Sequence, residues 1–274
     1  MYPYLTEIAG FTIKTYWALV MVGIVAGFIA LYMTTRSLDP KKKLNLFLFA
    51  LLCFVPVIVG SRLGYYLESL IAKTPYCTGT EMYSLIGPVS LWWGLLLAVV
   101  CALPLAGYLK LSVWEAADYF AAPVAIGGAF SKLGCFFNGC CLGMRAPESF
   151  PYSVTFPVFP YDPDALIPRY PVQVFESFAW LVIFIVVMIR FNRKLFNGEL
   201  FLDLSILYTV FRFFTEFLRE HASKSPLSIA QVFSLLCLIT AIVLFKYLLK
   251  KKVSNMALKK QVKFHNTKKR KLTK

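Results

Sequence analysis

VQVFESFAWLVIFIVVMIRF, residues 172–191, is the stretch that decides the fold class. It is almost entirely apolar over about the 20 residues that a helix needs to cross a bilayer. It lacks the regular alternation of a membrane β-barrel strand, so we predict a transmembrane helix. Similar apolar runs predict an all-α polytopic membrane protein with about seven spans, the others being 11–34, 44–68, 85–109, 118–139, 199–218 and 228–249.

The composition supports this class. Of 274 residues, 58% are hydrophobic and only 16% are charged, and the mean hydropathy is +0.65, which is too apolar for a water-soluble domain. The first apolar run is too long for the core of a signal peptide and has no basic stretch before it, so no cleavable signal is expected.

The basic residues indicate an orientation. The formal net charge is +15, and many of the cations lie in the tail from Lys246 onward and in the alternate connections 35–43, 110–116 and 192–198. This positive-inside pattern predicts that the N-terminus lies outside and the C-terminus in the cytoplasm. We expect a membrane domain over 1–250 and a disordered basic tail over 251–274 that lies near membrane lipids and has no nucleic-acid role.

In this orientation the polar side chains of the spans collect near the outer surface. Ionisable groups within a bilayer are costly and usually mark a site. Arg62 and Glu176 could instead reach the outer interface by snorkelling, whereas Lys132 and Arg212 lie deeper. The excess of cations suits an anionic phosphate head group, so we predict a phospholipid cleft open to the outer leaflet.

The segment RFFTEFLRE, residues 212–220, carries the clearest pattern. Arg212, Glu216 and Arg219 follow at i, i+4 and i+7 and therefore share one helix face. A purely structural ion pair between Arg212 and Glu216 is the alternative to a phosphate site.

A long segment rich in proline and aromatic residues, 146–170, separates two of the predicted spans. Its prolines exclude a regular helix, and loops of this length are usually functional. We expect an extracytoplasmic loop that covers the cleft; a passive connector is the alternative.

Seven stretches in order resemble the bacterial prolipoprotein diacylglyceryl transferases. They are TIKTYWALVMVG (12–23), GSRLGYYL (60–67), GPVSLWWGLL (87–96), GGAFSKLGCFFNGCCLG (127–143), YPVQVFE (170–176), RFFTEFLRE (212–220) and LSIAQVFSL (227–235). The resemblance covers residues 11 to 245 or so. It implies a seven-helix enzyme of the bacterial plasma membrane. Such an enzyme moves a diacylglyceryl group from phosphatidylglycerol to the lipobox cysteine of an exported prolipoprotein and releases glycerol phosphate.

The resemblance also implies site residues. Candidate catalytic residues are Tyr16, Lys132, Asn138, Cys140, Arg212 and Glu216. Candidate substrate-binding residues are Arg62, Trp92, Gly134, Cys135, Gly143, Gln173, Glu176, Arg219 and Gln231.

The departures from the family pattern fall at its chemical centre. Trp92 stands where the family has a histidine, and Lys132 where it has an arginine. Cys135 replaces an asparagine and Cys140 a glutamate, which indicates a divergent branch. Two rival interpretations therefore stay open: transfer to a different acceptor, and a non-catalytic protein that binds phospholipid.

The thiols admit several roles. Cys135, Cys140, Cys141 and Cys77 all fall on the predicted outer side, where a disulfide could form. Tight packing and a nucleophilic thiolate that carries the lipid group are the alternatives. No cysteine or histidine at matching ligand spacing completes the cluster as a zinc site, so we expect neither a metal nor a cofactor.

Overall fold

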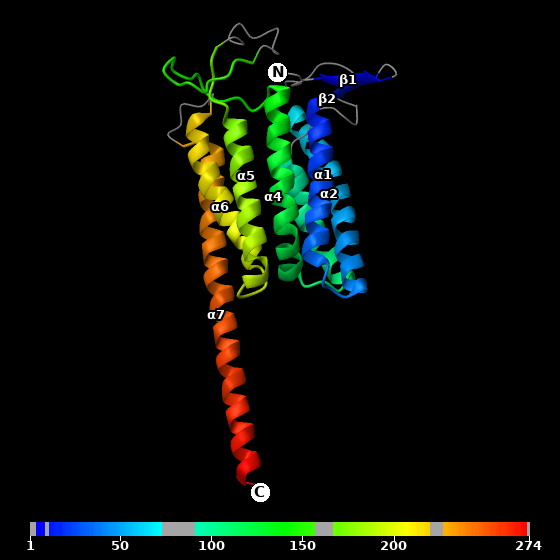
Figure 1. Ribbon diagram of the computed structural model, residues 1–274, viewed down its shortest axis with the longest axis vertical. Coiled ribbons are helices and arrows are strands. Elements are labelled where there is room, and N and C mark those ends of the chain that lie inside the picture. The colour runs from blue at the N-terminus through cyan, green and yellow to red at the C-terminus, as the bar shows by residue number, and fades with distance from the viewer. Residues whose placement is uncertain (1–3, 9–10, 73–90, 157–166, 220–226, 273–274) are drawn as a thin grey trace. The chain divides into compact units, whose positions relative to one another are not determined.

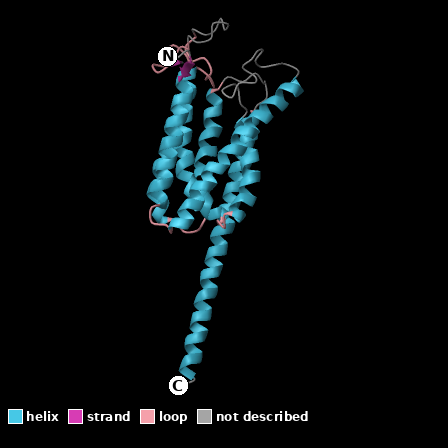
Figure 2. Cartoon of the chain, turned by 90° about the vertical axis from the view of Figure 1, so that its right-hand side faces the viewer, coloured by secondary structure: helices cyan, strands magenta, loops and turns pink. Residues whose placement is uncertain are grey.

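The computed structural model describes residues 4–8, 11–72, 91–156, 167–219 and 227–272. Most of these residues lie in helices, and a short β-hairpin lies near the N-terminus (Figures 1 and 2). The α-helices are α1 (Thr15–Thr35), α2 (Pro40–Ala72), α3 (Leu91–Tyr108), α4 (Val113–Asn138), α5 (Val172–Arg190), α6 (Glu199–Thr215) and α7 (Ile229–Leu272). The remaining elements are the strands β1 (Tyr4–Ile8) and β2 (Phe11–Lys14) and the 3-10 turns η2 (Phe191–Arg193) and η3 (Glu216–Leu218).

The predicted helical membrane class is confirmed in its main features. Five helical segments are long and apolar enough to cross a membrane, namely 15–35, 40–67, 113–138, 172–193 and 230–256. The apolar part of α3, Trp93–Tyr108, is shorter, and α6 has 17 residues. Many large apolar side chains are exposed on these helices, as faces in contact with lipid tails require.

Two helix boundaries differ from the sequence predictions. The first span was expected from residue 11, but Phe11–Lys14 pairs with β1 as an antiparallel strand and α1 begins at Thr15. Aromatic and β-branched residues at 11–13 favour this strand. At the other end, α7 continues to Leu272 through the segment predicted as a disordered tail (Figure 1). Its lysines, leucine and glutamine are good helix formers.

The chain forms two compact units. Residues 35–116 contain α2 and α3. These two helices pack closely because each has glycines on the side that contacts the other helix. A Cβ on Gly94 would lie 2.6 Å from the Val57 carbonyl oxygen, so only glycine fits there. Within this unit, the Lys42 ammonium lies 2.6 Å from the Glu115 carboxylate.

The second unit, residues 1–34 and 117–274, holds the predicted site. Its core packs small residues of α4 against large ones of α5, where Trp180 lies against Gly128 and Val187 is fully buried. Small residues let membrane helices approach closely. The buried core residues of this cluster are Ala30, Ala121, Ala122, Ala125, Ala129, Trp180, Ile183, Val187, Leu200 and Leu204.

A buried carboxylate on α4 fixes the start of α6. Asp118 is fully buried and accepts hydrogen bonds from the backbone N–H groups of Gly198 and Leu200, each at 2.9 Å. The Lys194 ammonium lies 2.9 Å from the same carboxylate. A side chain distant in sequence thus satisfies N–H groups that the first turn of α6 leaves unpaired.

Candidate functional site: a buried ion-pair cluster

Three cations converge on one fully buried carboxylate. Glu176, in the second turn of α5, lies 2.6 Å from the Lys132 ammonium of α4. It lies 3.3 Å from Nη1 of Arg212 and 2.9 Å from Nη2 of Arg219. A buried carboxylate is tolerated only when it is paired in this way. Glu176 therefore organises the cations; it is not a peripheral group reaching toward the interface.

A second carboxylate completes the cluster. Glu216 is buried at the start of η3, and its Oε2 lies 2.5 Å from Nη1 of Arg212 and 3.9 Å from Nε of Arg219. Both arginines thus lie between two carboxylates. Three positive and two negative formal charges leave the cluster with a net positive charge, which suits an anion.

The start of α7 is tied to the same cluster. The Ser228 hydroxyl donates a hydrogen bond to Oε1 of Glu216 at 3.0 Å. The backbone N–H of Gln231 donates to the Ser228 hydroxyl, and the backbone N–H of Ser228 donates to Oε1 of Gln231. This reciprocal pair is a capping box. Gln231, predicted to bind substrate, here holds the first turn of α7, with its amide nitrogen 3.5 Å from the Phe213 carbonyl oxygen.

Backbone pairing holds Arg219 in place. After η3 the chain becomes extended, and Arg219 forms an antiparallel bridge with Gly143. The N–H of Met144 donates to the carbonyl of Leu218 at 2.8 Å. Gly143 is required at this crossing because a Cβ there would lie 2.3 Å from the Tyr170 carbonyl oxygen.

The segment after Gly143 is folded back on itself at its described ends. Val154 and Arg169 exchange backbone hydrogen bonds of 3.0 Å, and the N–H of Ala146 donates to the carbonyl of Pro168. Arg169 is buried, and its Nη1 donates to the Gly143 carbonyl at 3.2 Å. Sequence reasoning missed Arg169 as a structural element of this loop.

A tight turn presents the cysteines. α4 ends at Asn138, and Gly139 and Cys141 adopt left-handed conformations, with φ angles of 68° and 60°. The Gln173 amide, fully buried, donates to the Cys140 carbonyl at 2.7 Å. Gln173 thus holds the turn in place, and the Cys140 thiol donates a hydrogen bond to the Cys135 carbonyl at 3.7 Å.

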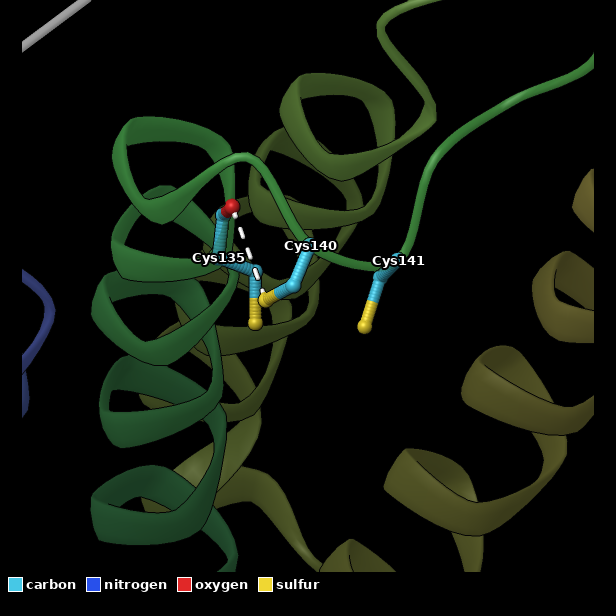
Figure 3. Close-up of side chains that lie close together, drawn as sticks. All are labelled: Cys135, Cys140 and Cys141. Carbon is cyan, nitrogen blue, oxygen red and sulfur yellow. Dashed lines mark hydrogen bonds between the residues drawn. The ribbon is translucent and has the colours of Figure 1, made fainter. Parts of the chain in front are cut away.

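The three thiols of this region lie together (Figure 3). The sulfur atoms of Cys135, Cys140 and Cys141 lie within 4.8 Å of one another, and all three cysteines are free. Hydrogen bonds from the Cys135 and Cys140 thiols, and then the positive charges of Lys132 and Arg219, lower the pKa of the Cys141 thiol. The thiols therefore adjoin the ion-pair cluster.

Tyr16 and Gly134 are in contact where α1 packs alongside α4. A Cβ on Gly134 would lie 3.1 Å from the Tyr16 ring, so the glycine permits this close approach. The Tyr16 ring also makes an edge contact with the Trp17 ring, with 5.1 Å between the ring centroids.

Two of the predicted substrate-binding residues lie outside the unit that holds this cluster. Arg62 and Trp92 belong to the unit formed by residues 35–116. The side chain of Trp92, and all of Cys77, lie outside the described residues. Sequence reasoning also missed Ser228, although the pattern Ser-x-x-Gln before an apolar run is the sequence signature of a capping box.

The fold and the cluster together define a helical membrane protein with a cationic site built from four of its helices or their ends. Residues 3–247 match the family model described as prolipoprotein diacylglyceryl transferase. The chain therefore belongs to the prolipoprotein diacylglyceryl transferase family and is a transferase of that type.

Individual relatives match over most of their length. The chain is 29% identical over 254 residues to the phosphatidylglycerol–prolipoprotein diacylglyceryl transferase of Clostridium tetani, covering 89% of this chain and 97% of the relative. It is 26% identical over 244 residues to enzyme 2 of that name from Clostridium perfringens, covering 88% of this chain and 93% of the relative. The Thermosynechococcus vestitus enzyme of the same name is 26% identical over 249 residues, which are 85% of this chain and 87% of the relative.

Proposed function

We propose that this protein transfers a diacylglyceryl group from phosphatidylglycerol to the lipobox cysteine of an exported prolipoprotein. The names of the relatives supply the two substrates, and the ion-pair cluster of Lys132, Glu176, Arg212, Glu216 and Arg219 is the observation that carries the proposal. We place this cluster toward the outer leaflet, with the N-terminus outside, the C-terminus in the cytoplasm and seven membrane spans.

The proposed step forms one bond and breaks one. The acceptor sulfur attacks the glyceryl carbon that carries the phosphate ester, forming a C–S bond. The C–O bond to the phosphate breaks, and its electron pair leaves with glycerol phosphate. The thiol proton passes to a carboxylate, for which Glu216 is the candidate.

Charge explains the need for the cations. The phosphate gains negative charge as it leaves, and groups that stabilise this charge in the transition state accelerate the reaction. Arg212 and Lys132 are our candidates for this role, with Arg219 as support. Glu176 and Glu216 hold Arg212 between them at 3.3 and 2.5 Å, so the guanidinium is already oriented before substrate arrives.

The remaining predicted residues receive subsidiary roles. Tyr16 would line the site near Lys132, and Asn138 and Cys140 would shape the turn beside it. Arg62 and Trp92 stay candidates for lipid binding from the sequence alone. Gln231 would act by fixing the start of α7, which Ser228 joins to Glu216.

The test is rescue of a bacterial strain depleted of its own diacylglyceryl transferase. The wild-type chain should restore growth and lipoprotein maturation, whereas Arg212→Ala should not. Arg193→Ala, at an exposed arginine of η2, is the matched control and should rescue fully. Membrane levels of each variant must be equal by immunoblot.

A second assay separates the rival interpretations. Purified protein is incubated with labelled phosphatidylglycerol and an acceptor peptide that carries a lipobox. Release of glycerol phosphate with labelled peptide supports the proposal. Release without rescue and without labelled peptide would indicate a different acceptor, and no release at all would indicate a lipid-binding protein.

A further inference from the structure

Cys135, Cys140 and Cys141 form a cluster of thiols whose sulfur atoms the proposed reaction does not use. Their sulfurs all lie within 4.8 Å of one another, and each can offer one ligand atom to a metal ion. Cys135 comes from the last turns of α4, and the other two come from the turn that follows (Figure 3). We propose that these three thiolates bind a zinc ion, with water in the fourth position.

The spacing of the sulfurs suits a metal. Zinc–sulfur bonds of about 2.3 Å in a tetrahedral site place the sulfurs ~3.8 Å apart. Sulfurs already within 4.8 Å need to move by only about 1 Å to reach that arrangement. Thiolates are the ligands that soft and borderline metals such as zinc prefer.

A disulfide or simple packing explains the cluster less well. A disulfide requires two sulfurs about 2.05 Å apart and would leave the third thiol without a role. A packing role predicts burial, but only Cys135 is buried, while Cys140 is partly exposed and Cys141 is exposed. A metal site with an open position needs this access on one side.

The surroundings support the charge and geometry of such a site. Three thiolates around a divalent ion carry one negative charge, and the positive charges of Lys132 and Arg219 act on Cys141. The Gln173 amide holds the Cys140 carbonyl at 2.7 Å, and the N–H of Cys140 donates to the Cys135 carbonyl at 3.1 Å. Such contacts around the ligands orient a metal site.

The left-handed turn at Gly139 and Cys141 also supports a metal site. With φ angles of 68° and 60°, Gly139 and Cys141 reverse the chain so that consecutive cysteines can face the sulfur of Cys135. A non-glycine residue in this conformation is uncommon and persists where the surroundings require it. Zinc bound by all three sulfurs would provide such a requirement.

The experiment measures metal directly. The full-length protein is purified in detergent with a phosphine reductant, loaded with zinc, desalted and analysed for metal by mass spectrometry. We expect about one zinc per chain in the wild type, as for a single site. The triple variant Cys135→Ser, Cys140→Ser, Cys141→Ser should lose it, and Cys237→Ser, at an exposed thiol of α7, should keep it.

Cobalt gives a readout that does not depend on the variants. Loading the wild type with Co²⁺ should produce a thiolate-to-metal charge-transfer band and the intense visible bands of tetrahedral cobalt, and zinc should abolish both. The proposal would be overturned if the wild type and the triple variant contained equal amounts of zinc, or if the cobalt spectra were octahedral. It would also be overturned by a disulfide within the cluster that prevented metal loading after reduction. Neither measurement uses transferase activity, so the two proposals can fail separately.

Discussion

The Lys132 ammonium and the Glu176 carboxylate lie 2.6 Å apart, and the carboxylate is fully buried. This contact joins the last third of α4 to the second turn of α5. It also draws Lys132 to the group that holds both arginines. Removal of one charge at this point should therefore affect all three cations together.

Glu176→Gln tests that dependence. The amide keeps the shape but leaves three buried or half-buried cations without their shared partner, and breaking a buried pair costs about 3–5 kcal/mol. We expect a lower unfolding temperature in detergent and loss of diacylglyceryl transfer. Glu148→Gln, at an exposed carboxylate in the segment between α4 and α5, is the control and should change neither the unfolding temperature nor the transfer. An unchanged unfolding temperature for Glu176→Gln would contradict the role of this residue.

Gly143→Ala tests the crossing of the loop and Arg219. The new methyl group would lie 2.3 Å from the Tyr170 carbonyl oxygen, so the backbone must shift and the bridge to Arg219 must open. Such overpacking costs about 1–3 kcal/mol or more. Gly107→Ala is the matched control, since a Cβ there meets nothing within 4 Å. Thermal unfolding followed by tryptophan fluorescence should give a lower unfolding temperature for Gly143→Ala than for Gly107→Ala. Equal unfolding temperatures would show that the loop accommodates the methyl group.

Asp118→Ala tests the buried start of α6. The change removes the acceptor of the Gly198 and Leu200 N–H groups and the partner of Lys194. Each buried donor left unsatisfied costs about 1–3 kcal/mol, so little folded protein should be recovered from membranes. Asp39→Ala, at an exposed cap of α2, should cost only about 1 kcal/mol. Size-exclusion profiles in detergent provide the measurement, and a normal profile for Asp118→Ala would refute this assignment.

Ser228→Ala tests the link between the ion-pair cluster and α7. Loss of the cap costs about 1 kcal/mol, and Glu216 loses the hydroxyl at 3.0 Å. We expect modest destabilisation and reduced transfer, both restored by Ser228→Thr. Ser205→Ala, at a hydroxyl that bonds only within α6, is the control. If the alanine variant transferred lipid at the wild-type rate, the hydroxyl would have no role in orienting Glu216.

Hydropathy located the helices well because a bilayer-spanning segment must be apolar along its whole length. The helix ends were less predictable. Helix α1 begins only at Thr15 because Phe11–Lys14 pairs as a strand with Tyr4–Ile8. Hydropathy along the sequence does not show such pairing between two segments.

The site was predicted in part. Helical spacing placed Arg212 and Glu216 together, and their contact is as expected. Arg219 was expected on the same helix face, but the α-helix ends at Thr215, and Arg219 reaches Glu216 from extended backbone beyond η3. The central position of Glu176 could not be predicted. The helical periodicity of α5 shows on which side of the helix Glu176 lies, but not which residues of other helices pack against that side. The roles of Asp118 and Ser228 depend on contacts between different helices, and only the cap at Ser228 had a local signal.

Arg219 connects separate segments through both parts of its structure: its main chain pairs with Gly143 and its side chain reaches Glu176. One residue inserted or deleted nearby would slide an extended chain by about 3.3 Å and break one of these contacts. Engineered tags, labels and fusion sites should therefore avoid 139–145 and 216–219.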